Sequence, residues 1–238
     1  MNREQARSYR GVAHWNPMPN TFPPLVLFDL DGTLLDSAPD MLAAANRLLA
    51  EHGRAPLALA DFRDHVSRGG RAMLSVAFPD WDEEARLAML PAFLDLYEQD
   101  LASHGGPFPG VPELLDAIEA DGARWGIVTN KPEYLAKQLL PLLGWEQRCA
   151  ILLGGDSLPE RKPHPLPLLH CAQVLDVEPG DCVYVGDDRR DIDAARAAGM
   201  ASIIALWGYR QPGDDPGDWG GDVQLAHASD LLDGSRWP

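Results

Sequence analysis

The chain has 238 residues, of which 45% are apolar and 24% are charged, a composition typical of globular proteins. Twenty basic residues against 36 acidic ones give a formal charge of −16, which argues against a nucleic-acid partner because such partners select a basic face. No apolar run reaches the roughly 18 residues that a membrane-spanning helix needs. The length allows one large domain or one domain with an insert.

Residues 1–23 are predicted to form a flexible leader, because they are polar and contain Pro, Asn and Gly. They lack the apolar segment of a secretory signal peptide. The cysteines Cys149, Cys171 and Cys182 stand apart among apolar neighbours, so we interpret them as reduced core residues. We therefore expect a cytoplasmic protein.

From residue 24 onward, predicted strands and helices alternate along the chain. Short apolar runs predict strands over 24–29, 124–130, 149–155, 181–188 and 201–207. Helical patterns, most with an early proline and a closing glycine, lie over 111–122, 131–144, 164–177 and 191–199. This alternation predicts an α/β fold with a doubly wound parallel sheet.

Residues 38–107 interrupt the alternation and show only helical patterns, over 37–53, 59–78 and 81–106. The first of them opens with Ser37 and Asp40 at the spacing of a capping box. We predict that this segment is an inserted all-α cap. Residues 24–37 and 108–238 then form the catalytic core.

Two aspartates, Asp29 and Asp31, directly follow the first predicted strand. Ligands of parallel sheets bind outside the carboxyl ends of the strands. Side chains alternate along an extended chain, so both carboxylates are expected to face the same way, and Gly32 lets the backbone turn. Paired carboxylates suit a divalent cation with oxygen ligands. They also suit a nucleophile working beside an acid/base.

The other strand ends carry complementary groups. Thr129 and Asn130 follow the second strand before a helix, an arrangement that can hold phosphate. Lys162 follows the third strand and can bind phosphate oxygens. Asp187 ends the fourth strand and is a natural third metal carboxylate. Together these residues predict Mg²⁺-assisted phosphoryl transfer through an aspartyl-phosphate.

In this order the four motifs resemble those of the haloacid dehalogenase superfamily. They are "DLDGTL" from Asp29, Thr129 in "VTNKP", Lys162 in "RKPHP" and Asp187 in "VGDDRRD". The resemblance covers about residues 25–232, and the helical insert matches the C1 cap of that superfamily. It implies a Rossmann-type core.

Within the superfamily the chain is similar to the phosphoglycolate phosphatase group, through "FDLDGTLLDSAPD", "FPGVPELLDAI" and "VTNKP". It also resembles, more closely, a subgroup of N-acetylmuramic acid 6-phosphate phosphatases. The stretches that carry this likeness are "VSRGGRAM", "WGIVTNKP", "VGDDRRDI" and "GYRQPGDDPGDWGGDV". We take the broader activity, a phosphoglycolate phosphatase-like hydrolase of phosphoric monoesters, as the prediction. The cell-wall recycling activity is the alternative.

The resemblance also implies a role for each motif residue. Asp29 would attack phosphorus, while Asp31 would protonate the leaving oxygen and then deprotonate the hydrolytic water. Mg²⁺ would be bound by the Asp29 and Asp187 carboxylates and the backbone carbonyl of Asp31. The phosphoryl group would be bound by Thr129, Asn130 and Lys162.

Three further positions are interpreted with alternatives. Many relatives carry Ser where this chain has Asp188, whose carboxylate either reaches the metal through water or faces solvent. For Asp191 we favour contact with a metal-bound water over a role at the start of its helix. In the cap, Arg68 and Gly69 occupy a bend in "VSRGGRAM" and are predicted to set substrate specificity. The alternative for Arg68 is a solvated position.

The expected partner is a small phosphorylated metabolite that carries a carboxylate. We expect no nucleic acid, no membrane, and a monomer or homodimer. A phosphomutase remains open, because no motif decides how long the intermediate survives. A non-catalytic binding module is disfavoured because Asp29, Asp31 and Lys162 are all present.

Overall fold

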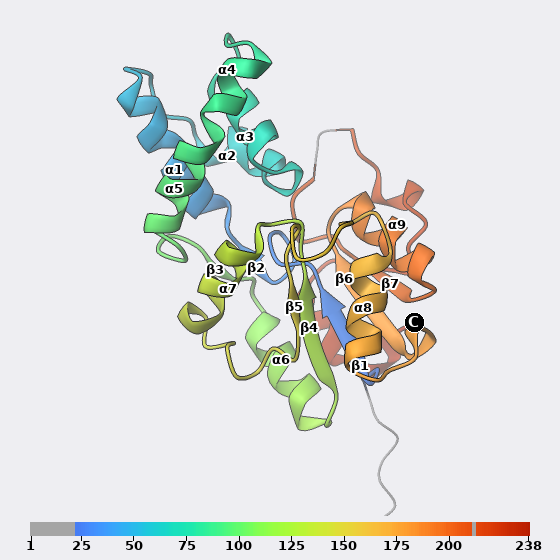
Figure 1. Cartoon of the computed structure of the whole chain (residues 1–238). Coiled ribbons are helices and arrows are strands. Elements are labelled where there is room, and N and C mark those ends of the chain that lie inside the picture. The colour runs from blue at the N-terminus through green and yellow to red at the C-terminus, as the bar shows by residue number, and fades with distance from the viewer. Residues whose placement is uncertain (1–21, 211–212) are drawn as a thin grey trace, which may run out of the picture.

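The structure is a computed structural model that describes residues 22–210 and 213–238 (Figure 1). Of the predicted leader, only residues 22 and 23 fall within this range, and the rest lies outside the described residues. Phe22 is buried, with its ring 5.5 Å from that of Trp237. Among the described helices, none is long and apolar enough to cross a membrane.

A six-stranded parallel sheet with the order β5-β4-β1-β6-β7-β8 forms the centre of the molecule. Its strands are β1 Leu25–Phe28, β4 Arg124–Val128, β5 Leu152–Leu153, β6 Cys182–Gly186, β7 Ala201–Ala205 and β8 Val223–Leu225. Leu25 of β1 lies opposite Arg124 on one side and Cys182 on the other, so β1 is an interior strand. The predicted parallel α/β sheet is confirmed. The three-residue β8 was not predicted.

Helices cover both faces of the sheet, which explains why its strands are apolar on both sides. One face packs on α6 Val111–Ala120 and α7 Glu133–Leu142, and the other on α8 Leu166–Val174 and α9 Arg189–Ala198. Side chains of β1 alternate between these layers, with Val26 and Phe28 in the first and Leu25 and Leu27 in the second. Short 3₁₀ helices lie at Pro179–Asp181, Pro216–Asp218, Ala228–Leu232 and Gly234–Arg236.

The segment predicted as the cap, residues 38–107, stands as a helical lobe beyond the carboxyl ends of the strands (Figure 1). Its elements are α1 Ala38–Glu51, α2 Leu59–Phe62, the 3₁₀ helix Arg63–Arg68, α3 Gly70–Ala77, α4 Glu83–Ala88 and α5 Leu90–Gln99. The single helical run predicted over 81–106 is two helices, because the chain turns at Met89 and a proline occupies the first turn of α5.

The two chain crossings between core and cap form a small antiparallel sheet of β2 Leu35–Asp36 and β3 Gly106–Pro107. The capping box expected from Ser37 and Asp40 is wrong, since the Ser37 side chain makes no capping hydrogen bond. The Asp40 carboxylate instead accepts hydrogen bonds from the backbone N–H groups of His104 and Gly105, at 2.7 and 3.1 Å. Asp40 therefore ties the two crossings together.

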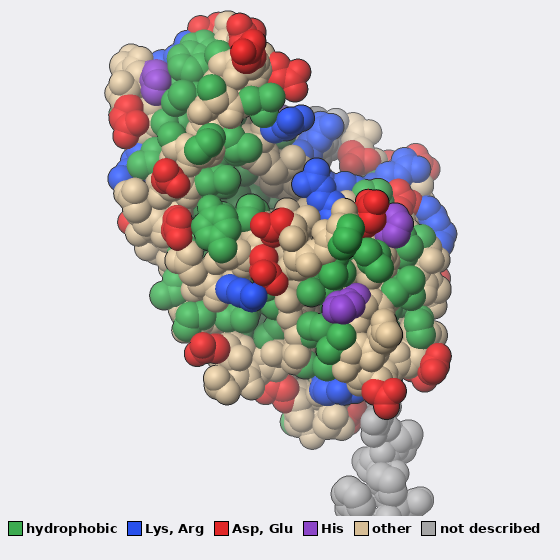
Figure 2. All heavy atoms as spheres, viewed as in Figure 1, with side chains coloured by type: hydrophobic (Ala, Val, Ile, Leu, Met, Phe, Trp, Pro, Cys, Tyr) green, Lys and Arg blue, Asp and Glu red, His purple; other side chains and the backbone are tan. Residues whose placement is uncertain are grey.

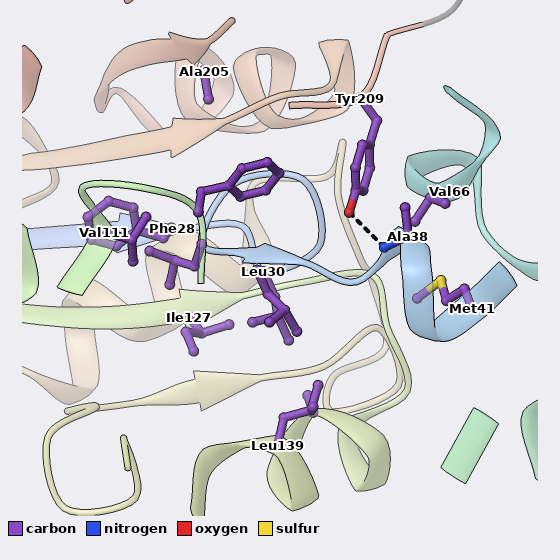
Figure 3. Packing of buried hydrophobic residues seen from close by; sticks show 14 of the residues in the cluster. Phe28, Leu30, Ala38, Met41, Val66, Val111, Ile127, Leu139, Ala205 and Tyr209 are labelled. Carbon is purple, nitrogen blue, oxygen red and sulfur yellow. Dashed lines mark hydrogen bonds between the residues drawn. The ribbon is translucent and has the colours of Figure 1, made fainter. Parts of the chain in front are cut away.

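Tyr209 fixes the first chain crossing, where the chain passes from the core into the cap (Figure 3). Its hydroxyl accepts a hydrogen bond from the Ala38 N–H at 3.0 Å and donates one to Asp36 Oδ1 at 2.9 Å. Arg63 pairs with both Asp36 oxygens at 2.9 Å, and its guanidinium lies 4.9 Å above the centre of the Tyr209 ring. One phenol thus satisfies a buried N–H and joins the first crossing to the core.

We expect Tyr209→Phe to lower the free energy of unfolding by about 1–3 kcal/mol, because the buried Ala38 N–H loses its acceptor. Urea unfolding followed by circular dichroism measures the change. Tyr134→Phe is the matched control, since the Tyr134 side chain is 43% exposed. Equal stability of the two variants would contradict a structural role for the Tyr209 hydroxyl.

Candidate active site

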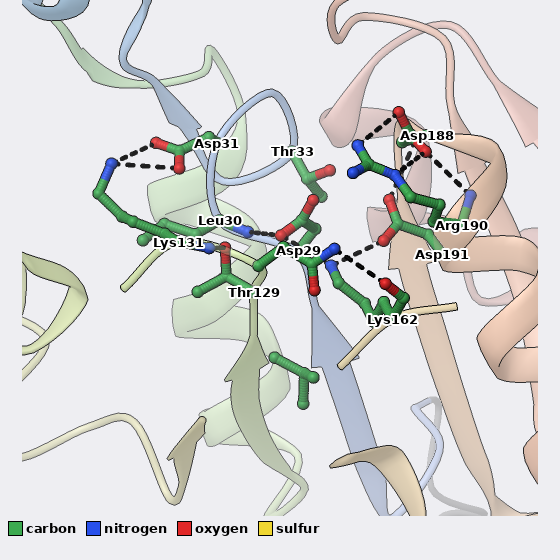
Figure 4. Close-up of polar contacts among 12 residues, drawn as sticks. Asp29, Leu30, Asp31, Thr33, Thr129, Lys131, Lys162, Asp188, Arg190 and Asp191 are labelled. Atoms are coloured by element: carbon green, nitrogen blue, oxygen red, sulfur yellow. Dashed lines mark hydrogen bonds and ion pairs between the residues drawn. The ribbon is translucent and has the colours of Figure 1, made fainter. Parts of the chain in front are cut away.

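Asp29 is the first residue beyond β1, at the edge of the sheet that faces the cap. Its backbone N–H donates to Val185 O at 2.9 Å and so continues the pairing with β6. Its Oδ1 accepts a hydrogen bond from Leu30 N at 2.8 Å and lies 2.9 Å from Lys162 Nζ (Figure 4). The carboxylate is held rigidly in a buried position.

Asp29, Asp187 and Asp191 form a cluster of buried carboxylates, whose nearest oxygens all lie within 4.8 Å of one another. Burial, together with the charges of Asp29 and Asp191, raises the pKa of Asp187 well above its ordinary value. Burial also raises the pKa of Asp191 to about 7; Lys162 opposes this shift, and the charges of Asp29 and Asp188 add to it. This concentration of like charge fits a divalent cation with oxygen ligands.

Neutral donors orient Asp187 within this cluster. Thr33 Oγ1 donates to its Oδ1 at 3.0 Å, while Tyr209 N and Ser67 Oγ donate to its Oδ2 at 2.9 and 3.0 Å. Gly32 turns the chain beside it with a φ of +90°, and a Cβ on Gly32 would lie 2.1 Å from Asp187 Oδ2. Only glycine fits that turn, because a side chain would displace the carboxylate.

Lys162 lies between two members of the cluster, 2.9 Å from Asp29 Oδ1 and 2.7 Å from Asp191 Oδ1. Its ammonium also donates to the Tyr184 hydroxyl at 2.7 Å. Burial by itself lowers the pKa of Lys162, but the charges and hydrogen bonds of Asp191 and Asp29 outweigh it and raise the pKa. The lysine therefore stays cationic and offsets part of the negative charge.

Thr129 and Asn130 follow β4, the strand beside β1, and so lie at the same edge of the sheet as Asp29. Thr129 Oγ1 accepts a hydrogen bond from Lys131 N at 3.2 Å, so its hydroxyl hydrogen remains available to a ligand. Asn130 Nδ2 donates to Lys162 O at 3.0 Å and braces the lysine loop. Its Oδ1 is buried and has no hydrogen-bond partner among the residues that the structure describes.

Asp31 is not part of the carboxylate cluster. Its two oxygens lie 3.0 and 3.2 Å from Lys131 Nζ, and Figure 4 shows the side chain directed toward that ammonium. The Asp29 and Asp31 side chains line the same cavity, but they pair with different lysines, Lys162 and Lys131. The suggested metal contact of Asp31 involves its backbone carbonyl and is independent of this pairing.

Asp188 lies at the start of α9 and is partly buried, and the water-mediated metal contact considered for it stays a prediction. Its carboxylate caps α9 by accepting from Arg190 N at 2.9 Å, and it holds the Arg190 guanidinium at 2.7 and 2.9 Å. Arg190 in turn donates to the backbone oxygen of Ser67 in the cap. Asp191 belongs to the carboxylate cluster and also completes the capping box, accepting from Asp188 N at 3.0 Å.

A cavity of about 300 Å³ lies between the cap and the core. The core contributes Asp29, Asp31, Thr129, Asn130 and Lys162, and the cap contributes Arg68 and Gly69. The cap side is otherwise largely apolar, with Met41, Val66, Met73, Leu90, Phe93 and Leu94. Figure 2 shows basic side chains gathered where the two lobes meet, in agreement with Arg68, Arg71, Arg161 and Arg190 in the lining.

Several contacts of the site were missed from the sequence, among them those of Thr33 and Ser67 with Asp187 and of Tyr184 with Lys162. Lys131 stands inside the quoted "TNKP" stretch, so its place after a motif residue was the available signal. Tyr209, which donates its backbone N–H to Asp187, offered none, because the two residues come together only through packing of the loop after β7.

Residues 26–205 match the model of a family described as haloacid dehalogenase-like hydrolase. The chain belongs to this family. The predicted membership and its Rossmann-type core are confirmed.

Relatives of this haloacid dehalogenase-like hydrolase carry two kinds of name. A protein of Xylella fastidiosa named phosphoglycolate phosphatase is 57% identical over 222 residues, covering 93% of this chain and 97% of the relative. A protein of Pseudomonas aeruginosa named N-acetylmuramic acid 6-phosphate phosphatase is 41% identical over 209 residues, covering 87% and 92%. A crystal structure of a predicted phosphoglycolate phosphatase from Haemophilus somnus has a TM-score of 0.79 and 28% identity, covering 90% of this chain and 98% of that one.

The pKa of Asp187 is higher in the folded metal-free protein than in the unfolded chain. The free energy of unfolding therefore decreases as the pH rises above about 4, the ordinary aspartate pKa. We therefore expect Asp187→Asn to raise the melting temperature of the metal-free protein near neutral pH by about 2–4 °C. Millimolar Mg²⁺ should raise the melting temperature of the wild type but not that of the variant.

Differential scanning fluorimetry with and without a chelator measures both effects. Asp181→Asn, at an exposed position, is the matched control and should behave like the wild type. A wild-type melting temperature that is indifferent to Mg²⁺ would argue against a cation site at this cluster.

Proposed function

We propose that this chain is a Mg²⁺-dependent phosphatase that hydrolyses a small phosphomonoester through an aspartyl-phosphate on Asp29. One observation carries the proposal: a buried carboxylate at a strand end lies 2.9 Å from Lys162 and within 4.8 Å of two further carboxylates. The proposed nucleophile and a fixed cation thus line one cavity, and the two other carboxylates lie beside them. The predicted enzyme class, a haloacid dehalogenase-like phosphatase, is confirmed by relatives that are 57% identical over most of the chain.

The first half-reaction transfers the phosphoryl group to the protein. Leu30 N and Lys162 Nζ both hold Asp29 Oδ1, so we assign the attack on phosphorus to Oδ2. The bond between phosphorus and the leaving oxygen breaks, and its electron pair stays on that oxygen. The carboxylic acid of Asp31 gives the leaving oxygen a proton, so the leaving group departs as an alcohol.

The second half-reaction returns Asp29 to its starting state. A water oxygen attacks phosphorus, and the Asp31 carboxylate takes one of the water protons. The bond between phosphorus and Asp29 then breaks, releasing inorganic phosphate and the free carboxylate. We assign Thr129 Oγ1 and Lys162 Nζ as the donors to the phosphoryl oxygens, which lets Lys162 exchange a carboxylate partner for the substrate.

The carboxylates of Asp29 and Asp187 and the backbone carbonyl of Asp31 are the proposed ligands of Mg²⁺. When bound, the ion supplies positive charge between two anions, the nucleophile and the phosphate, which otherwise repel each other. Asp191 keeps its pairing with Lys162 and is suited to a metal-bound water.

Phosphoglycolate is the first substrate candidate, because relatives named phosphoglycolate phosphatase are 57% identical to this chain. Arg68 lines the cavity from the cap, and a guanidinium can bind a substrate carboxylate through two hydrogen bonds. The location that we infer is the cytoplasm, because Cys149, Cys171 and Cys182 are free thiols.

We expect Asp29→Asn to abolish Mg²⁺-dependent phosphate release, because the amide is not a nucleophile toward phosphorus. Phosphate release from phosphoglycolate and from N-acetylmuramic acid 6-phosphate, measured side by side with Asp181→Asn as the control, checks this expectation. Activity of Asp29→Asn above a few per cent of wild type would refute the covalent mechanism.

N-Acetylmuramic acid 6-phosphate is the second candidate, and the apolar cap wall favours it. The cavity of about 300 Å³ reaches the lower end of the range for small-molecule sites, roughly 300–1,000 Å³. Phosphoglycolate has a single methylene group and makes little use of Met73, Leu90 and Leu94. A sugar with an acetyl group and a lactyl carboxylate has apolar surface to place there, and a relative bearing that name is 41% identical.

Leu94→Trp separates the two candidates by narrowing the apolar half of the cavity. If the sugar phosphate is the substrate, we expect kcat/KM for it to fall by at least about tenfold, since the ring loses room, while phosphoglycolate turnover changes by less than about threefold. Leu142→Trp is the control, because Leu142 is 59% exposed. Higher wild-type kcat/KM for phosphoglycolate, with no selective effect of Leu94→Trp, would favour the smaller substrate.

A further inference from the structure

We propose that Lys131 is a positioning residue that orients the general acid–base Asp31, and that Tyr97 makes this orientation depend on docking of the cap. The inference rests on the proposed function, because it assigns a task within that reaction. Neither the motif roles given above nor the names of the relatives assign a function to Lys131 or Tyr97.

The Lys131 ammonium has three acceptor atoms within hydrogen-bonding distance. Nζ lies 3.0 and 3.2 Å from the two oxygens of Asp31 and donates to the Tyr97 hydroxyl at 2.8 Å. It also lies 4.4 Å from the centre of the Tyr97 ring. Asp31 follows β1, Lys131 follows β4, and Tyr97 belongs to α5 of the cap. One nitrogen therefore joins three segments that are distant in the chain.

Burial makes this pairing energetically important. The side chain of Lys131 is 3% exposed and that of Asp31 is 12% exposed. A buried ammonium is costly unless a counter-charge and hydrogen bonds compensate it. Within the described residues, Asp31 is the carboxylate that pairs with Lys131. Burial, with the charges of Asp31 and Asp40, raises the pKa of Tyr97 well above its ordinary value, so the phenol stays neutral.

The consequence for Asp31 is a defined orientation. A single donor within hydrogen-bonding distance of both oxygens restricts rotation of the carboxylate plane. The backbone of Lys131 is itself held, because its N–H donates to Thr129 Oγ1 at 3.2 Å. The proton-transfer group and the phosphate-binding hydroxyl are thus positioned by the same residue.

The contact with Tyr97 adds a link to the cap. Tyr97 is buried at 2% exposure, and it lines the cavity together with Asp31 and Lys131. When the cap moves away, Lys131 loses its hydroxyl acceptor and the aromatic face above it. The acid–base group is then correctly held only when the cavity is closed and water is excluded.

If Lys131 only linked the cap to the core, its loss would slow the reaction of every substrate equally. If it positions Asp31, its loss would slow only substrates whose leaving group needs a proton. An alkyl phosphate needs a proton from Asp31, because the leaving oxygen otherwise departs as a strongly basic alkoxide. p-Nitrophenyl phosphate needs none, because p-nitrophenolate leaves with the electron pair and remains an anion. Misplacing Asp31 should therefore slow transfer from the alkyl phosphate and spare transfer from the aryl phosphate.

The experiment compares Lys131→Met, Tyr97→Phe and the matched control Lys137→Met, whose lysine is 60% exposed on α7. The alkyl substrate is whichever of phosphoglycolate and N-acetylmuramic acid 6-phosphate the wild type turns over faster. Stopped-flow measurement of the first p-nitrophenolate released reports transfer to Asp29 alone. For Lys131→Met we expect kcat on the alkyl phosphate to fall on the order of 10²-fold, as for general acid–base groups. KM and the p-nitrophenolate burst rate should change by less than about threefold.

Tyr97→Phe keeps the ammonium and removes one hydroxyl, so we expect the same selectivity with a smaller loss, about three- to tenfold on the alkyl phosphate. It also covers the case in which Lys131→Met does not fold. Equal losses on both substrates, or no loss in either variant, overturn the inference.

The wild type and Asp29→Asn, run on the same substrates, test the proposed function separately. A wild type that shows neither turnover nor a burst above Asp29→Asn would reject that function, and the inference falls with it. An active wild type whose variants lack the leaving-group selectivity would reject the role of Lys131 alone.

Discussion

The repulsion among three buried carboxylates, relieved in part by one buried ammonium, is the constraint around which the rest of the site is arranged. Lys162 lies between Asp29 and Asp191, while Asp187 depends on neutral donors. The Tyr184 hydroxyl accepts from Lys162 and donates to Val128 O at 2.7 Å, which ties the ammonium to the sheet. A parallel sheet makes this possible, because the carboxyl ends of its neighbouring strands meet along one edge.

The cap contacts two of the proposed site carboxylates, Asp187 and Asp31, through different residues. Ser67 of the cap donates to Asp187, and Arg190 fastens the backbone of Ser67 to the core. Tyr97 of the cap reaches Asp31 through Lys131. The cap therefore covers the cavity and contacts both the proposed metal ligand Asp187 and, through Lys131, the proposed acid–base Asp31. The Asp188 carboxylate orients the Arg190 guanidinium toward the cap.

The sequence predicted the long and strongly patterned elements well. Five of the six sheet strands and the four helices on the faces of the sheet lie at the expected places, because their apolar runs and proline–glycine punctuation are local signals. β2, β3 and β8 have two or three residues each and were not predicted, whereas the equally short β5 was predicted because it stands in the longer apolar run 149–155. The capping box failed for a different reason: the Asp40 carboxylate binds the second chain crossing, more than sixty residues away.

By itself, the sequence determined which chemical groups stand at the ends of the strands. A carboxylate, a hydroxyl, a lysine and another carboxylate each follow a buried strand, and parallel strands bring such ends together whatever the details of packing. Only the tertiary structure decided the partners. Lys131 holds Asp31 across 100 residues of chain, and Tyr209 holds Asp36 across 173. Contacts at that separation depend on how two lobes dock and how loops pack, and no local pattern along the chain records those relations.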